Sequence, residues 1–135
     1  NDWSARDVQR QEMTVGLGPA KGKDFAISLG PWLVTPDELS FSGGRLDVEA
    51  WVTVNGEELS RGRSAEMHWT WEQVVAHAGR DTRLRAGDVI GSGTLNRGCL
   101  LELNAGAAEP RWLAPGDVVE IGAEGLGALR TEIVT

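Results

Sequence analysis

The sequence is poor in cysteine, in positive charge and in long apolar runs, and each shortage excludes a class of protein. Cys99 is the only cysteine, so an internal disulfide framework is excluded and a reducing compartment, the cytoplasm, is expected. The 13 basic residues are outnumbered by 20 acidic ones, and a net charge of −7 gives no basic footprint for nucleic acid. No apolar run is long enough to cross a membrane, and we see no signal peptide. We therefore expect neither a nucleic-acid partner nor a membrane partner.

What is present is the composition of a globular protein. A chain of 135 residues, 41% of them hydrophobic, suits one domain with a hydrophobic core. No linker and no repeat divides it. The chain has no initiator methionine and begins inside a dense polar motif. We therefore expect residues 1–135 to form a single domain whose N-terminal part is missing.

Short strands separated by turns dominate the pattern. The 18 glycines and many turn signals interrupt short β-branched runs. Residues 46–54 alternate between apolar and polar side chains, which predicts a half-buried strand. Asn55-Gly56 then predicts a hairpin that pairs this strand with residues 57–60. Further strands are expected at 25–29, 99–103, 118–121 and 126–134, and a turn leading into a strand at 84–90.

Two segments have helical spacing instead. Residues 1–13 place apolar side chains near helical spacing, with Asp2 or Ser4 available as the N-cap. Residues 71–78 do the same, with Thr70 ahead of them as the N-cap. The expected fold class is mainly β (α+β), a mixed β-roll, sandwich or barrel with one or two short helices.

The first 31 residues hold the densest polar chemistry in the sequence. Carboxylate, guanidinium, amide and ammonium groups stand there beside glycines and aromatics, a mixture that a packed core does not need. Carboxylate oxygens bind hard cations such as Mg²⁺ or Ca²⁺, while Arg, Lys and Gln side chains bind the oxygens of an anionic substrate. Asp2 is the candidate metal ligand. From composition alone, capping a helix is the commoner role of such an aspartate.

Three motifs in this stretch resemble those of the fumarylacetoacetate hydrolase family. They are Asn1-Asp2-Trp3-Ser4-Ala5-Arg6-Asp7-Val8-Gln9, Gly16-Leu17-Gly18-Pro19-Ala20-Lys21-Gly22-Lys23-Asp24-Phe25-Ala26 and Pro31-Trp32-Leu33-Val34. The similarity continues in order through Val54-Asn55-Gly56, Leu84-Arg85-Ala86-Gly87-Asp88, Gly91-Ser92-Gly93-Thr94, Leu101-Glu102-Leu103, Gly116-Asp117-Val118-Val119 and Gly125-Leu126-Gly127. The first motif is highly specific, and the similarity covers essentially the whole chain. The resemblance implies that the chain is the C-terminal part of the family's catalytic domain.

The activity that this resemblance implies is hydrolysis of a carbon–carbon bond in a fumarylacetoacetate-like dioxo acid, an acylpyruvate, as in aromatic amino acid catabolism. The family works through a metal-stabilised enolate and usually forms homodimers, so Mg²⁺ (or Ca²⁺ or Mn²⁺) and a second copy are the expected partners. Asp2 matches the last of the family's metal carboxylates. The earlier ones, including a Glu-x-Glu pair, are not in this chain.

The remaining site residues are also implied position by position. Arg6 and Gln9 match residues that hold the substrate's oxygens, and Thr94 matches a threonine that contacts a substrate carboxylate. Lys23 matches the lysine that stabilises negative charge as the carbon–carbon bond breaks. Glu102 matches the glutamate that orients a catalytic histidine, and that histidine is absent here.

The chain departs from the family pattern at one position. Many members have threonine four residues after the lysine, where this chain has Ile27, which offers no hydroxyl. Ser28 could replace that hydroxyl only if the strand register shifted, because neighbouring side chains in a strand point to opposite faces.

Three functional hypotheses stay open at this point. The first is the carbon–carbon bond hydrolase, of which this piece alone would be inactive. The second is a hydratase, isomerase or decarboxylase of a 2-oxo acid, which needs the same enolate stabilisation. The third is a non-catalytic β-rich binding module, in which the polar residues would be scattered rather than convergent.

Several residues have plainer explanations than a site. The turn around Lys23 lacks the first glycine of a nucleotide-binding loop and is followed by Asp24, so a phosphate site is rejected. His68 and His77 are not at metal-site spacing; His68, among aromatic residues, could line a pocket, and His77 fits a helix surface. Cys99 has no neighbour in the sequence that marks a reactive thiolate except a nearby arginine, so a packed thiol is expected.

Overall fold

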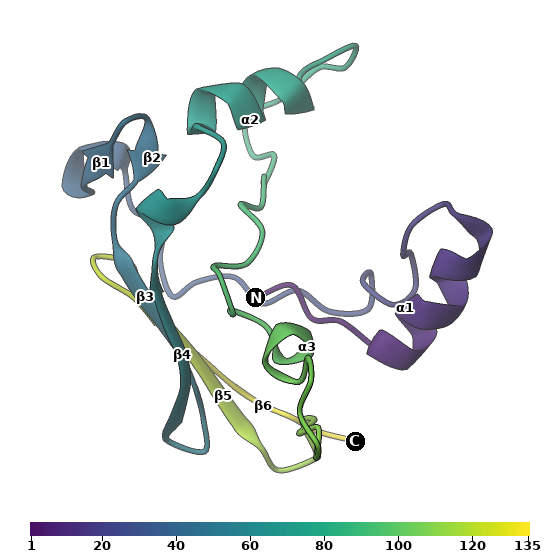
Figure 1. Ribbon diagram of the computed structural model, residues 1–135. Coiled ribbons are helices and arrows are strands. Elements are labelled where there is room, and N and C mark those ends of the chain that lie inside the picture. Colours follow the sequence, from purple (N-terminus) through teal and green to yellow (C-terminus); the bar gives the residue numbers. More distant parts are fainter.

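The computed structural model describes residues 1–135, and its main element is a four-stranded antiparallel sheet (Figure 1). Its strands lie in the order β4-β3-β5-β6. Their bounds are β3 (Glu49–Val54), β4 (Glu57–Arg63), β5 (Val118–Ala123) and β6 (Gly127–Glu132). A separate two-stranded ribbon is formed by β1 (Phe41–Ser42) and β2 (Arg45–Leu46). The mainly β class predicted from the sequence is therefore confirmed.

Short helices connect these strands. They are α1 (Arg6–Glu12), α2 (Trp71–Ala78) and α3 (Leu100–Leu103), with 3₁₀ turns η1 (Met13–Val15), η2 (Pro36–Glu38) and η3 (Ser64–Glu66). No helix is long and apolar enough to cross a membrane. Figure 1 shows α1 at the end of an arm that projects away from the sheet, whereas α3 lies beside the sheet.

The hairpin between β3 and β4 forms as the sequence predicts. Asn55 and Gly56 both have positive φ, 53° and 81°, which the tight turn matched to strand twist requires. Val54 at the end of β3 pairs with Val119 of β5, and both side chains are buried. The alternation of apolar residues thus places the small core on one face of β3 and β5.

Helix α2 also agrees with its sequence signals. The Thr70 hydroxyl accepts the N–H of Gln73 at 3.3 Å, and the Gln73 side chain accepts the N–H of Thr70 at 2.9 Å. This reciprocal capping box satisfies two of the N–H groups that a helix start leaves free.

Four expectations about local structure were wrong. Residues 25–29 are not a strand, because only one isolated bridge, Asp2 to Ile27, pairs them with another segment. Residues 99–103 form helix α3 instead of a strand, since leucine and glutamate favour helix and the Cys99 carbonyl accepts the first helical N–H groups. The turn at 84–88 exists but no strand follows it. Neither Asp2 nor Ser4 caps α1, which begins at Arg6 after an uncapped Ala5.

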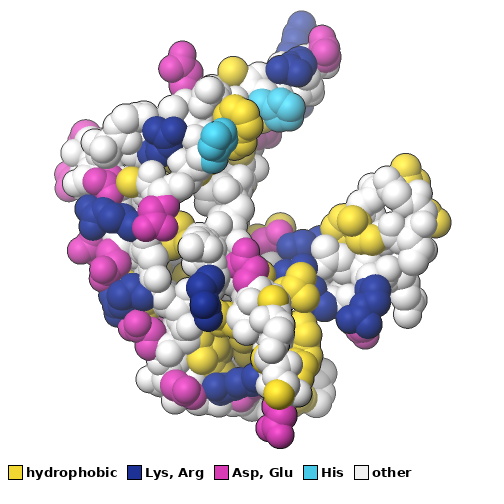
Figure 2. All heavy atoms as spheres, in the orientation of Figure 1, with side chains coloured by type: hydrophobic (Ala, Val, Ile, Leu, Met, Phe, Trp, Pro, Cys, Tyr) yellow, Lys and Arg dark blue, Asp and Glu magenta, His cyan; other side chains and the backbone are white.

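The core is thin for a chain of this length. Only 5 of the 135 residues are buried, and the accessible surface is 9673 Å². A compact protein of 14.5 kDa exposes about 6,900 Å². Figure 2 shows where the extra surface lies: an open notch separates the α1 arm from the sheet. The candidate site lies in this notch.

Candidate active site

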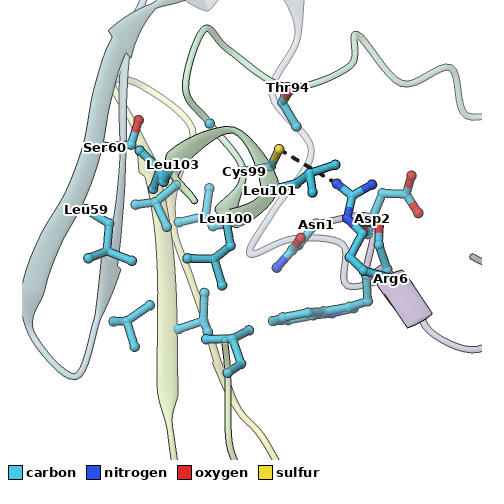
Figure 3. Close-up of a pocket in the computed structure, with 18 of the residues that line it drawn as sticks. Asn1, Asp2, Arg6, Leu59, Ser60, Thr94, Cys99, Leu100, Leu101 and Leu103 are labelled. Atoms are coloured by element: carbon cyan, nitrogen blue, oxygen red, sulfur yellow. Dashed lines mark hydrogen bonds between the residues drawn. The ribbon is translucent and has the colours of Figure 1, made fainter. Parts of the chain in front are cut away.

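A cavity of about 770 Å³ occupies the space between the N-terminal segment and the sheet. Its polar wall comes from residues 1–7 and from Lys23, and a further wall from the glycine-rich loop 91–94. Its apolar floor comes from the sheet and α3, including Val54, Val119 and Leu100. Figure 3 shows Leu59, Leu100 and Leu103 on one side of the cavity and Asp2 and Arg6 on the other. Such a space suits a small ligand with one charged part and one apolar part.

Asp2 and Lys23 meet at the rim of this cavity. The Lys23 Nζ atom donates to Asp2 Oδ2 at 2.9 Å, although 21 residues separate them. The Lys23 side chain is 31% exposed and that of Asp2 62%. The bridge to Ile27 holds the backbone of Asp2, and the turn before Lys23 brings the ammonium back to it. The two residues that the sequence pairs functionally are therefore neighbours in space, while their chemical roles stay predictions.

Arg6 lines the same cavity and is held from two sides. Its Nη1 donates to Gln9 Oε1 at 2.6 Å, one turn further along α1. Its Nη2 lies 3.7 Å from the Cys99 sulfur, a contact that Figure 3 marks with a dashed line. Gln9 itself does not line the cavity. The Arg6 guanidinium thus lines the cavity, and Gln9 holds it from outside the cavity wall.

Thr94 and Glu102 differ in where the fold places them. Thr94 lines the cavity from the loop 91–94, where Gly93 has a φ of +78°. Glu102 lies on α3, but its side chain is exposed and is not part of the cavity wall, which α3 supplies through its leucines. The structure therefore brings Asp2, Arg6, Lys23 and Thr94 to one cavity and leaves Glu102 outside it.

Neither histidine approaches this cavity. His68 lines a second cavity of about 480 Å³ and packs edge-on against Trp69, with ring centroids 4.6 Å apart. His77 is exposed on the last turn of α2. The segment 92–94 borders both cavities, so Thr94 faces each of them.

Ser28 does not replace the hydroxyl that Ile27 lacks. Its Oγ accepts the indole N–H of Trp3 at 2.8 Å, and neither Ile27 nor Ser28 lines the cavity. The hydroxyl instead fastens the segment after Lys23 to the N-terminal segment.

The contact between Arg6 and Cys99 could not be predicted from spacing. The two residues are 93 positions apart, and the arginine near Cys99 in the sequence, Arg97, is not the one that contacts it. Its side chain is half-buried and points into the cavity, so the expected packed thiol is also a neighbour of a charged group.

A divalent metal finds only part of a site in these residues. No group of three or more His, Cys, Asp or Glu side chains could hold a metal ion. Asp2 offers a hard carboxylate oxygen of the kind that Mg²⁺ prefers, but one carboxylate cannot hold the ion alone. Residues 1–135 could thus supply one ligand of such a metal centre, Asp2, but not the complete set of ligands.

Comparison with known proteins assigns the family. The model of the family described as "Fumarylacetoacetate (FAA) hydrolase C-terminal" matches residues 1–134. The chain belongs to the fumarylacetoacetate hydrolase family. The resemblance found in the motifs is therefore confirmed.

The proteins similar to this chain include hydrolases and a probable isomerase. A fumarylacetoacetase of Arabidopsis thaliana is 31% identical over 142 residues, covering 82% of this chain and 34% of the relative. The solved structure of a fumarylacetoacetate hydrolase from Exiguobacterium antarcticum matches with a TM-score of 0.77 and 29% identity, over 98% of this chain and 44% of that one. A probable 2-hydroxyhepta-2,4-diene-1,7-dioate isomerase from Mycobacterium abscessus matches with a TM-score of 0.76 and 30% identity, over 97% and 46%. The chain spans less than half the length of each.

Proposed function

We propose that this chain is the part of a Mg²⁺-dependent hydrolase that binds and cleaves a fumarylacetoacetate-like dioxo acid at a carbon–carbon bond. The observation that carries the proposal is the convergence of Asp2, Arg6 and Lys23 on one cavity. Two cationic groups and one carboxylate suit an anionic substrate beside a cation. A non-catalytic module would have no need to gather these residues from separate segments.

Substrate binding is assigned to three side chains. Arg6 would hold a substrate oxygen through the donors that Gln9 and Cys99 leave free, since a guanidinium has five N–H groups. Thr94 would donate its hydroxyl to a substrate carboxylate from the facing loop. Gln9 would bind through its free amide or by fixing Arg6, and the hydrogen bond between them supports the second role.

Stabilisation of negative charge is assigned to Lys23. When water adds to the carbonyl and the carbon–carbon bond breaks, the bonding electron pair moves to the departing fragment as an enolate, which later takes up a proton. An ammonium already in place where this charge develops lowers the barrier, and one such donor is typically worth about 10²–10³ in rate. The ion pair with Asp2 keeps the Lys23 ammonium at the cavity before substrate arrives.

The cation and the general base depend on groups outside residues 1–135. A bound Mg²⁺ would polarise the substrate's oxygens, and Asp2 would be one of its ligands. Activation of water needs a histidine beside Glu102, because neither His68 nor His77 lines the cavity. The exposed position of Glu102 leaves its carboxylate free to meet such a group.

The second candidate is an isomerase, hydratase or decarboxylase of a 2-oxo acid. The similarity to the probable isomerase from Mycobacterium abscessus favours it, and Lys23 would stabilise an enolate there as well. Glu102 favours hydrolysis over isomerisation and decarboxylation if it orients a histidine, because those two reactions do not need an activated water.

A homodimer is proposed as the assembled form. Several large apolar side chains are strongly exposed, among them Leu33 at 96%, Trp32 at 61% and Trp69 at 57%. Exposed aromatic and aliphatic groups of this size are typical of interaction surfaces.

The test compares two neighbouring lysines in the complete protein that contains this chain. We expect Lys23→Ala to lower turnover of an acylpyruvate in the presence of Mg²⁺ by about 10²-fold or more. Lys21→Ala is the matched control, because Lys21 is 79% exposed, pairs with Asp24 and does not line the cavity. It should change turnover by less than about twofold.

The same assay identifies the reaction. A panel of dioxo and 2-oxo acids, with products followed by mass spectrometry, separates cleavage from hydration, isomerisation and loss of CO₂. Equal effects of the two lysine variants would show that Lys23 has no special role in the reaction. If the complete protein converts none of these acids, the enzyme proposal is rejected.

A further inference from the structure

Glu12, the last residue of α1, binds a turn of the chain with its carboxylate. Oε2 accepts the N–H groups of Ala20 at 2.9 Å and Gly22 at 3.0 Å, and Oε1 accepts that of Lys21 at 2.6 Å. Three successive N–H groups that point to one place form a concave anion site. Here the chain's own carboxylate fills it, and the N–H of Gly22 is the first of the groups that lower the pKa of Glu12.

The same turn is pressed against the start of α1. The Gly22 carbonyl accepts the N–H of Ala5 at 2.9 Å, and Gly22 is one of the few buried residues. A methyl group added at Gly22 would lie 2.9 Å from the backbone nitrogen of Gln9, so only glycine allows this approach. The turn therefore packs closely against the start of α1, and the Glu12 carboxylate holds it in that position.

Lys23 follows this turn directly. Its N–H continues the turn by donating to the Ala20 carbonyl at 3.0 Å, and its side chain leaves towards Asp2. The rest of the loop has little to hold it, because Val15 is 71% exposed and Leu17 is 89% exposed. A lysine side chain is long and flexible, so the place of its ammonium depends on how firmly its backbone is fixed.

We propose that Glu12 is a positioning residue that sets the Lys23 ammonium against Asp2 at the mouth of the cavity. The inference rests on the proposed function for its catalytic consequence. Glu12 does not line the cavity. It acts by joining the turn that carries Lys23 to the helix that carries Arg6, so that both cations of the site belong to one rigid unit.

The first experiment measures the position of Lys23 without any assay of activity. Limited acylation of the complete protein with acetic anhydride, followed by peptide mass spectrometry, gives a labelling rate for each lysine. In Glu12→Gln we expect Lys23 to be labelled at least about threefold faster, and by a larger factor than Lys21, whose exposed ammonium the charge of Glu12 also influences. The glutamine NH₂ group is a donor and cannot face three N–H groups. An unchanged rate at Lys23 in the folded variant overturns the inference.

Two further variants serve as controls for charge and for folding. Asp24→Asn removes a carboxylate from the same turn, but the Asp24 carboxylate bonds only Lys21, so the Lys23 rate should not change. Glu12→Asp keeps the charge on a side chain one methylene shorter, and it should give an intermediate rate. If Glu12→Gln does not fold, Glu12→Asp decides, and a wild-type rate at Lys23 in that variant overturns the inference.

The catalytic consequence is tested with a double-mutant cycle. Glu12→Gln should lower kcat by about tenfold or more while KM changes by less than about threefold. On a Lys23→Ala background the same substitution should cost nothing further, because a residue that acts through Lys23 has nothing left to position. An equal loss of kcat on both backgrounds would assign Glu12 a merely structural role and overturn the inference.

The two sets of outcomes are separable. Faster labelling of Lys23 together with full activity of Lys23→Ala supports the positioning by Glu12 and rejects the proposed function. Loss of activity in Lys23→Ala together with unchanged labelling in the Glu12 variants rejects the positioning and supports the proposed function.

Discussion

Arg6 makes one side-chain contact within the N-terminal segment and one that reaches the segment of Cys99. Its hydrogen bond to Gln9 lies within one helical turn, and its contact with Cys99 reaches a segment 93 residues away. The two acceptors are unequal, because an amide oxygen at 2.6 Å is strong and a thiol sulfur at 3.7 Å is weak. Gln9 therefore determines the direction of the guanidinium.

Gln9→Leu tests this dependence. We expect the KM for the substrate to rise about tenfold or more, because hydrogen bonds to charged groups contribute about 1.5–3 kcal/mol. Steady-state kinetics of the complete protein measure the change. Gln11→Leu is the matched control on the same helix, since the Gln11 side chain is exposed and bonds nothing. A KM shift of the same size in both variants would mean that the helix, and not Arg6, was disturbed.

At the scale of single residues, the sequence marked several of the side chains that line the cavity but not the contacts that they make. Asp2, Arg6 and Lys23 stand in motifs specific enough to be named. Glu12 is not among the site residues predicted from the sequence, because three N–H groups converge on it only once the turn has folded. Such convergence leaves no fixed spacing in the sequence, so no pattern could have marked it.

Elements whose signals are local were predicted, and elements that need a distant partner were not. The β3–β4 hairpin depends on the adjacent residues Asn55 and Gly56, and α2 depends on the Thr70 capping box. Each of these signals lies within a few residues of the element that it determines. Residues 25–29 have the side chains of a strand but only one bridge to pair with. A strand exists only where a neighbour accepts its hydrogen bonds, and that neighbour cannot be read from the segment itself.

Thr70→Ala tests the local character of α2. The substitution removes one acceptor of the capping box and should destabilise the helix by about 1 kcal/mol. Since α2 contains no buried residue, we expect faster amide hydrogen exchange confined to Gln73 and the residues after it. Thr82→Ala, which removes a hydroxyl that bonds nothing, should leave exchange unchanged. Faster exchange throughout the central sheet as well would show that α2 is coupled to the core.

The whole molecule exposes far more surface than its mass requires. The excess over a compact protein of this size is about 2,800 Å², larger than the area that either partner buries in a standard interface. The apolar floor of the cavity, which includes Val54, Val119 and Leu100, is open on the side of the notch (Figure 2). The proposed substrate-binding groups therefore lie beside an apolar surface that residues 1–135 leave open.

The proposed metal centre has one candidate ligand in this chain, Asp2, and calorimetry can measure how strongly the chain alone binds Mg²⁺. Residues 1–135 offer Asp2 but no group of three or more ligating side chains, and the Lys23 ammonium already binds one of the Asp2 oxygens. We expect the isolated chain to be inactive and to bind Mg²⁺ with a Kd of about 1 mM or weaker, since Mg²⁺ keeps its waters unless several oxygens replace them. Asp2→Ala in the same titration is the control, and it should remove what weak binding there is. Binding with a Kd in the micromolar range that survives Asp2→Ala would mean that the ion is held elsewhere on the chain, and Asp2 would lose its assigned role.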